Sequence, residues 1–316
     1  MPVTYKSLDS ELKSTVRSTL TPRGKTIYVH ANDGSDGDSG RSWTRAYQTM
    51  AKAFSVLSSG DTIYFAGKIR EQLITPVQVF DVSVIGAGNR PRHADDAPTP
   101  TGGKTAATWT TPASGATTAA LCKVLQQGWR FENILFAGPS DHASLWFFRD
   151  NGADDAERDA SHGVVRECRF ASGQDGIHVT EVANLLIEDN QFNDLTGHAL
   201  KGVAGSGIAN PLRGTFRRNV VEGCANGFYN SCNKWRIYDN VFDDGGTPTT
   251  TVVLNTDGDG ANGANNFVFR NYFQTTTANF NSPDIVGCTT DLWVQNFSFD
   301  ATSAGVGGNF EAGKPA

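Results

Sequence analysis

Short apolar segments recur along this chain, and each is broken by a polar residue at the same point. The repeated phrase is an apolar strand, an Asn, an aromatic or aliphatic residue, a gap of seven residues or more, and a second short apolar strand. Successive phrases lie roughly 21 to 34 residues apart, a spacing typical of stacked structural repeats. The Asn residues that fit the phrase are Asn133, Asn190, Asn219, Asn240, Asn271 and Asn296.

These segments favour strands over helices. They are short, rich in β-branched and aromatic residues and interrupted by Gly, whereas a helical array needs long stretches of 3.6-residue periodicity. The pattern therefore predicts a coil of short parallel strands. An Asn at one point of every turn tolerates tight backbone and bonds to neighbouring backbone, so we expect stacked Asn side chains to form a structural ladder. Cys168 occupies the equivalent place in VVRECRF and is expected to be a small buried thiol.

The N-terminal third adds a second signal. The segment TIYVHANDGSDGDSGRSWTRAYQTMAKAFSVLSSGDTIYFAGKIRE contains a strand, a Gly/Asp-rich loop, a candidate helix and a "GDT" strand. Over residues 26–299 the chain resembles the right-handed parallel β-helix proteins of the pectate-lyase-like superfamily. The resemblance implies an all-β solenoid whose open end is covered by an amphipathic helix at residues 44–57. Residues 1–25 then form an N-terminal arm and residues 300–316 a C-terminal tail.

Composition agrees with a single domain that grows by adding turns. The chain has 316 residues, 34 Gly and a charged fraction of 19 %. Its net charge is −6 and it has no basic run, which argues against nucleic acid as a partner. No apolar stretch is long enough to cross a membrane, and residues 1–25 lack the apolar core of a signal peptide. We therefore expect no membrane partner and no ordinary secretion signal.

The second strand of each turn predicts a row of outward side chains. If Leu145, Ile177, Leu200 and Phe228 face the core, alternation turns their successors to the solvent. Those successors are Trp146, His178, Lys201 and Tyr229. At about 4.8 Å per turn they would cover roughly 15 Å, the length of a few sugar units. A one-residue slip would instead bury all four.

The outward row is a candidate glycan-binding surface. Aromatic rings suit sugar faces, and Lys201 or His178 could meet an acidic sugar or move a proton. Members of the resembled family bind glycans along the outer face of the coil, and some use a Lys or Arg as the base. The alternative is that these side chains are ordinary solvent-exposed surface.

The acidic residues and the cysteines give weaker indications of a site. Asp33, Asp36 and Asp38 are a weak candidate calcium site, because the spacing matches no known cage and polar turns explain such residues better. Calcium is thus the only cofactor left open. The five Cys residues form no CxxC pair, so we expect reduced, buried thiols.

Two functions remain open from the sequence. We expect a non-enzymatic surface protein, most plausibly a phage virion component such as a decoration, fibre or spike-like appendage, because β-helices are frequent in such appendages. In that case the N-terminal arm binds other virion proteins, the protein is located in the virion, and a homo-oligomer is left open. The alternative is a polysaccharide lyase or depolymerase that acts on an acidic glycan and reaches the extracellular space by a non-classical route.

Overall fold

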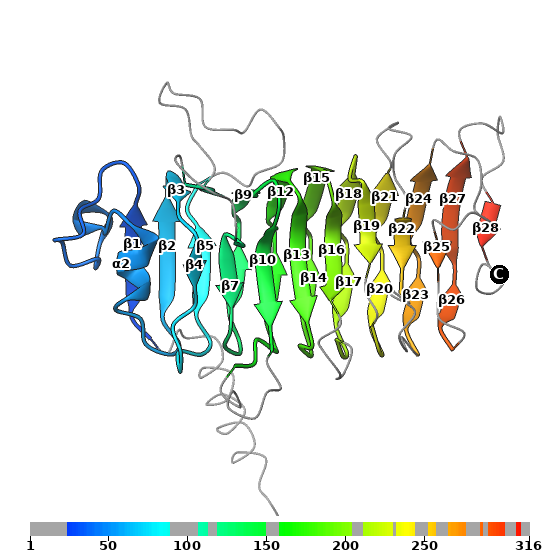
Figure 1. The fold of residues 1–316 in the computed structure, drawn as a ribbon, viewed down its shortest axis with the longest axis horizontal. Helices are drawn as coiled ribbons and strands as arrows, with labels where there is room; N and C mark the ends of the chain where they lie inside the picture. Colours follow the sequence, from blue (N-terminus) through cyan, green and yellow to red (C-terminus); the bar gives the residue numbers. More distant parts are fainter. Residues whose placement is uncertain are drawn as a thin grey trace, which may run out of the picture.

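The protein is a long coil of short strands that stack into three sheets (Figure 1). The computed structural model describes residues 24–88, 107–112, 119–149, 158–203, 211–229, 232–243, 252–256, 265–275, 285–286, 290–300 and 308–310. In these ranges neighbouring strands are parallel, apart from one antiparallel pair at the C-terminal end. The predicted all-β parallel β-helix is therefore confirmed.

The turns from β2 to β25 each contribute one strand to each of three sheets, which we name sheets A, B and C. Sheet A contains β1 (Thr26–His30), β2 (Thr62–Ala66), β5 (Ser83–Gly86), β8 (Arg130–Glu132), β11 (Val164–Arg166), β14 (Leu186–Glu188), β17 (Thr215–Arg217), β20 (Arg236–Tyr238), β23 (Phe267–Phe269) and β26 (Leu292–Val294). Sheet B contains β3 (Lys68–Arg70), β6 (Thr108–Thr110), β9 (Leu135–Ala137), β12 (Arg169–Gly173), β15 (Gln191–Leu195), β18 (Val220–Glu222), β21 (Val241–Asp243), β24 (Tyr272–Thr275), β27 (Asn296–Asp300) and β28 (Gly308–Phe310). Sheet C contains β4 (Leu73–Ile74), β7 (Cys122–Val124), β10 (Ala143–Phe148), β13 (Asp175–Thr180), β16 (His198–Val203), β19 (Asn226–Tyr229), β22 (Val252–Asn255) and β25 (Ile285–Val286).

Aromatic side chains stack along the inside of the coil, where every turn places an equivalent residue above the last. The rings of Phe136, Phe170 and Phe192 follow one another at 5.0 and 4.8 Å between centroids, and their planes are nearly parallel. All three side chains are fully buried. Stacked rings at such distances add attraction to the burial of apolar area. The core is therefore a continuous column that neighbouring turns share.

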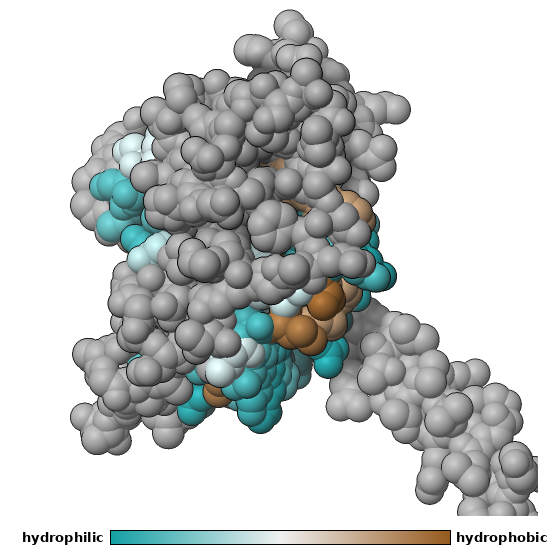
Figure 2. Space-filling model, turned by 90° about the vertical axis from the view of Figure 1, so that its right-hand side faces the viewer, coloured by the Kyte–Doolittle hydropathy of each residue, from teal (hydrophilic) through white to brown (hydrophobic). Residues whose placement is uncertain are grey.

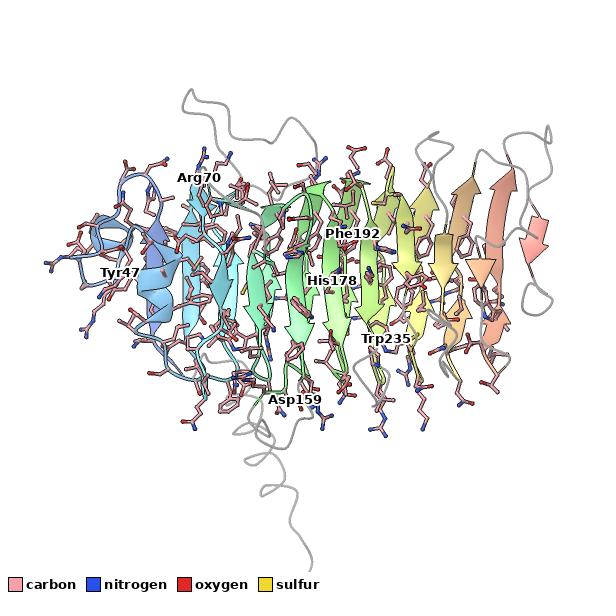
Figure 3. The ribbon with its side chains drawn as sticks, in the orientation of Figure 1. Tyr47, Arg70, Asp159, His178, Phe192 and Trp235 are labelled. Atoms are coloured by element: carbon pink, nitrogen blue, oxygen red, sulfur yellow. The ribbon has the colours of Figure 1, made fainter. Side chains whose placement is uncertain are left out.

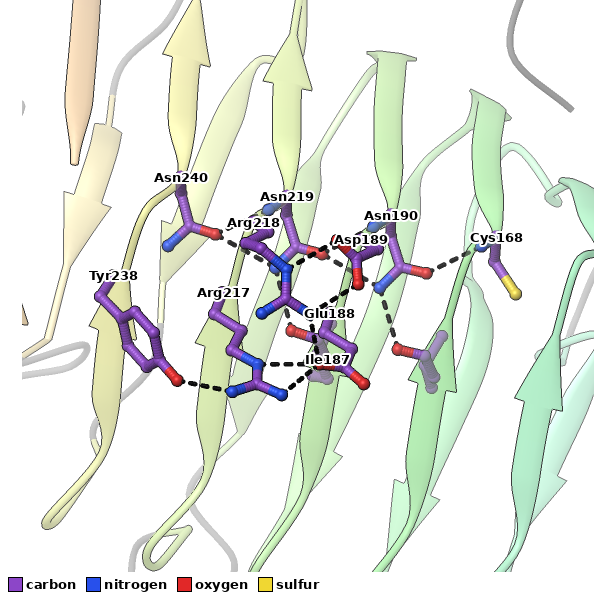
Figure 4. Close-up of polar contacts among 11 residues, drawn as sticks. Cys168, Ile187, Glu188, Asp189, Asn190, Arg217, Arg218, Asn219, Tyr238 and Asn240 are labelled. Carbon is purple, nitrogen blue, oxygen red and sulfur yellow. Dashed lines mark hydrogen bonds and ion pairs between the residues drawn. The ribbon is translucent and has the colours of Figure 1, made fainter. Parts of the chain in front are cut away.

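The corner between sheets A and B holds the predicted Asn ladder (Figure 4). Asn219 shows the pattern: its Nδ2 donates to the backbone oxygen of Ile187 on the preceding turn and to Oδ1 of Asn240 on the next. Its backbone N–H donates to the same Oδ1. At the start of the ladder, the backbone N–H of Cys168 donates to Oδ1 of Asn190. The same contacts link Asn190, Asn219, Asn240, Asn271 and Asn296.

Asn133 does not belong to this ladder, and its assignment from the sequence was wrong. In the turns from β8 to β26 the residue just before the ladder position has a positive φ, and Asn133, with φ 58°, is that residue in its turn. The ladder position itself is taken by Ile134, which is fully buried. Asn133 instead donates from Nδ2 to the backbone oxygens of Gly86 and Gly88. Asn tolerates left-handed backbone well, which explains its presence one residue early.

The N-terminal cap is shorter than predicted. Residues 44–57 were expected to form one helix, but the structure has a 3₁₀ turn, η1 (Trp43–Arg45), and a five-residue helix, α2 (Met50–Phe54). The backbone between them is held extended because Tyr47 pairs with Val29 in a β-bridge. Thr49 then caps α2 by accepting a hydrogen bond from the backbone N–H of Lys52. The buried side of the helix consists of Met50, Ala53 and Phe54.

The remaining expectations concern thiols and chain ends. Among the described cysteines, Cys122, Cys168, Cys224 and Cys232 are buried, as expected, and burial raises the pKa of the Cys168 thiol to about 12. Cys288, most of the N-terminal arm and most of the C-terminal tail lie outside the described residues. Residues 308–310 form β28, which pairs antiparallel with β27.

Apolar side chains are exposed on the outer surface near the C-terminal end of the coil. Tyr272, Leu292 and Phe297 are exposed on the last turns. Figure 2, which views the molecule from this end, shows brown apolar surface next to hydrophilic surface. In the described ranges neither helix has the length or the apolar character of a membrane span.

Candidate functional site

The outer face of sheet C carries the predicted row of side chains, and its register is as expected. Trp146 on β10 pairs with His178 on β13, which pairs with Lys201 on β16, which pairs with Tyr229 on β19. All four are half-buried. The residues before them, Leu145, Ile177, Leu200 and Phe228, are fully buried in the core. His178 lies near the middle of the coil (Figure 3).

A buried carboxylate holds two histidines at this row. Oδ2 of Asp175 lies 2.6 Å from Nε2 of His178, three residues later on β13. Oδ1 of Asp175 lies 2.8 Å from Nδ1 of His198 on β16, and it also accepts the backbone N–H of His198. The Asp175 side chain is 2 % exposed, while those of His178 and His198 are 16 % and 17 % exposed. We call Asp175, His178 and His198 the bridged histidine pair.

The charge state of Asp175 fixes the protons on both rings. Burial alone would raise the pKa of its carboxyl, but hydrogen bonds from His178 and His198 outweigh that effect and hold the pKa well below the usual range. An ionised carboxylate only accepts hydrogen bonds, so Nε2 of His178 and Nδ1 of His198 carry the protons. In the neutral rings the other nitrogens, Nδ1 of His178 and Nε2 of His198, have free lone pairs. Each ring is thereby prepared as a base.

Aromatic rings border the bridged histidine pair. The ring of Tyr229 lies 5.4 Å from that of His198, and the ring of Trp146 lies 6.1 Å from that of His178 in an edge arrangement. Trp146 Nε1 donates to Oγ1 of Thr180, which fixes the indole. Trp146 thus contacts His178 from the N-terminal side of the row, and Tyr229 contacts His198 from the C-terminal side. Both contacts help to hold the imidazoles in place.

Lys201 completes the group. It neighbours His178 and Tyr229 on the row, and its side chain is half-buried. Within the described part of the chain no carboxylate forms an ion pair with its ammonium. A cation next to two potential bases can bind an anionic group and orient it over a histidine.

The candidate calcium residues have other partners. Asp36 Oδ1 accepts the backbone N–H groups of Gln48 and Thr49, and Oδ2 accepts the Thr49 hydroxyl. Asp33 and Asp38 lie near His30 and Arg45. Among the residues that the structure describes, no three His, Cys, Asp or Glu side chains gather as a metal site would require. The role of Asp36 is to hold the backbone that precedes α2.

The sequence did not predict the contacts of the bridged histidine pair. Alternation along the strands predicts the outward row but not the hydrogen bonds of Asp175, since these depend on how β13 and β16 begin. Lys123, one turn before Trp146, was also missed because its strand is only three residues long. The three-residue spacing of Asp175 and His178 within a strand, with a second His one turn later, is the signal that could have indicated the cluster.

Comparisons with known proteins place the fold. No protein-family model and no curated protein sequence matches the chain. A solved rhamnogalacturonan lyase is similar over 87 % of this chain and 74 % of its own, with a TM-score of 0.54 and 13 % identity. An alginate lyase from Paenibacillus sp. str. FPU-7 covers 87 % of this chain and 95 % of its own, with a TM-score of 0.49 and 12 % identity. The similarity to the rhamnogalacturonan lyase structure supports a right-handed parallel β-helix fold for this chain.

Proposed function

We propose that this protein is a polysaccharide lyase that cleaves an acidic glycan bound along the outer face of sheet C. The observation that supports this most is the bridged histidine pair beside Lys201 on a solvent-accessible row. The similar solved structures named above are a rhamnogalacturonan lyase and an alginate lyase, and the fold they share with this chain is compatible with that chemistry.

The reaction that fits these groups is a β-elimination. A base removes the proton from the carbon next to the sugar carboxylate. The electron pair of that C–H bond becomes a carbon–carbon double bond and expels the glycosidic oxygen from the adjacent carbon. The departing oxygen takes a proton from water, and the proton on the base returns to solvent. The products are a shortened chain and an unsaturated uronate, with no change in overall oxidation state.

Each residue of the site has a defined role in this proposal. Nδ1 of His178 is the base, because Asp175 keeps the proton on the opposite nitrogen. The ammonium of Lys201 binds the carboxylate of the reacting sugar and stabilises the charge that develops there. Asp175 is a positioning residue, since it acts only through the histidines.

The test is a cleavage assay followed by the ultraviolet absorbance of unsaturated uronates. Polygalacturonate, rhamnogalacturonan and alginate would be offered with and without calcium. We expect one of them to be cleaved, His178→Ala to lose activity by about 100-fold or more, and Lys201→Ala to raise KM and lower kcat. Lys68→Ala, on sheet B, is the matched control and is expected to retain full activity. No absorbance change with any acidic polymer would refute the proposal.

The virion role remains a prediction from the sequence. The enzyme proposal is preferred because the similar solved structures carry the names of polysaccharide-cleaving enzymes and because the bridged histidine pair has the geometry of a proton-transfer site. Binding of the N-terminal arm to a larger assembly and location in a virion are compatible with a lyase. Co-purification of the protein with particles at fixed stoichiometry would test them.

A further inference from the structure

Lys123 extends the outer row of sheet C beyond the proposed site. On β7 it pairs with Trp146, so the row continues from Lys201 through His178 and Trp146 to Lys123. Its ammonium Nζ lies 4.3 Å from the centroid of the Trp146 ring and 4.0 Å from that of Phe148. The cation therefore sits against two aromatic rings at once.

These contacts fix the position of the positively charged Lys123 ammonium. Cation–π contacts at these distances are attractive, and rings that replace part of the water shell leave an ammonium less hydrated. The Trp146 ring is itself held by its hydrogen bond to Thr180. A long, flexible Lys side chain that is already ordered loses less entropy when it binds an anion. One face of Trp146 is also occupied by Lys123, so Trp146 acts as a spacer here and not as an open platform for a sugar ring.

The charge along the row has one sign. From Ile74 through Lys123, Trp146, His178, Lys201 and Tyr229 the row carries two lysines and a histidine and no acidic residue. The chain as a whole has a net charge of −6. A local cationic stripe on an acidic protein attracts polyanions to that stripe.

We propose that Lys123 forms a second anion subsite, which binds a uronate carboxylate of the acidic polysaccharide several sugars away from the cleavage point. Lys123 and Lys201 are three turns apart, about 14 Å at 4.8 Å per turn. One sugar cannot reach both cations, whereas an extended oligosaccharide can. The subsite rests on the proposed function. It adds the expectation that an oligosaccharide must be long enough to reach both Lys123 and Lys201 to bind tightly.

The experiment measures affinity and not turnover. Oligogalacturonates and oligoalginates of two and six units would be titrated calorimetrically into the full-length His178→Ala protein, with and without Lys123→Met. We expect Lys123→Met to weaken binding of the hexasaccharide by about tenfold, as for loss of one charge-assisted hydrogen bond, and to leave disaccharide binding unchanged. Lys123→Arg keeps the cation and the ring contacts and is expected to bind the hexasaccharide normally. Thermal unfolding of each variant checks that the fold is intact.

The outcomes separate the subsite from the proposed function. Equal affinity of Lys123→Met and its parent for the hexasaccharide, together with cleavage by the unmodified protein, would overturn the subsite alone. Equal weakening for both lengths would also overturn it, because the charge would then act at the cleavage point. A loss that is the same for sulfated oligosaccharides without uronate units would show general anion attraction and reject a carboxylate subsite. Absence of binding by any uronate would overturn both proposals.

Discussion

Nδ1 of His198 lies 2.8 Å from Oδ1 of Asp175, one turn earlier on the coil, while Oδ2 of the same carboxylate bonds to His178. One buried carboxylate is thus hydrogen-bonded to histidines on two neighbouring strands of sheet C. This arrangement depends on the parallel stacking of β13 and β16, and it links the position of each ring to the register of the sheet. The following predictions begin with this carboxylate.

Asp175→Asn is expected to reduce cleavage by about 100-fold or more while the protein stays folded. The amide can accept from one ring but must offer N–H to the other, which reverses the proton position on that imidazole. The measurement is kcat/KM as a function of pH, together with far-ultraviolet circular dichroism. A mere structural role would alter the melting temperature without altering the shape of the pH profile.

Stability should depend on pH through the same residue. The folded-state pKa of Asp175 lies below its unfolded value, so its contribution to stability is present above the unfolded pKa of about 3.9 and is lost as pH falls towards the folded pKa. We expect the protein to be more stable than Asp175→Asn at pH 6 and the difference to shrink below about pH 4. Urea midpoints for both proteins between pH 3 and pH 7 would measure this. A difference that grows as the pH falls would contradict it.

Asn219→Ala is expected to destabilise the fold by about 2–4 kcal/mol. The change removes the acceptor for two N–H groups of Asn190 and leaves the backbone oxygen of Ile187 without its donor, all in a buried corner. Cys168→Ala, at the same position of an earlier turn, removes only a small thiol and should cost about 1 kcal/mol. The shift of the urea midpoint gives both values. Similar losses for the two variants would mean that the ladder bonds contribute little.

Phe192→Ala is expected to cost about 3–5 kcal/mol, because it opens a cavity in the stacked column. Its ring lies between those of Phe170 and Phe216, at 4.8 and 6.0 Å. Phe192→Leu keeps most of the volume and should cost clearly less. Thermal and urea unfolding of both variants would test the expected order. The two variants should retain the cleavage activity of the folded protein.

Two carboxylates at or next to sheet A, Glu188 and Asp239, should respond differently to mutation. Glu188 is only 8 % exposed and accepts from both Arg217 and Arg218 (Figure 4), so Glu188→Ala is expected to cost about 2 kcal/mol or more. The pair between Asp239 and Arg270 is more exposed, and Asp239→Ala should change stability by less than about 1 kcal/mol. Unfolding midpoints at low and high salt would distinguish the two, since only the exposed pair is strongly screened.

The fold and the outward row could be predicted because they follow from periodicity. Alternation along a strand places Leu145 inside and Trp146 outside whatever the details of the turn. Asn133 could not be placed correctly, because its turn has Ile at the ladder position and Asn in the left-handed position before it. A sequence pattern that tolerates a shift of one residue cannot separate these two places.

The site chemistry was less predictable than the row that carries it. The hydrogen bonds of Asp175 join side chains that are 3 and 23 residues away in the sequence. Such contacts depend on turn geometry and on the number of residues in a complete turn, which varies along this chain. The length of the capping helix was overestimated for a similar reason, since the β-bridge of Tyr47 is a non-local contact.

The Asn ladder also determines where this coil can change length. Consecutive ladder residues are 29, 21, 31 and 25 positions apart, yet the step from sheet A to sheet B always consists of one left-handed residue and one ladder residue. An extra residue at this corner would move an amide out of line with both of its neighbours. In the turns from Cys168 to Asn296, insertions are therefore confined to the other two corners, next to sheet C. Variation in loop length can thus reshape the surroundings of the outward row while the coil that supports it stays in register.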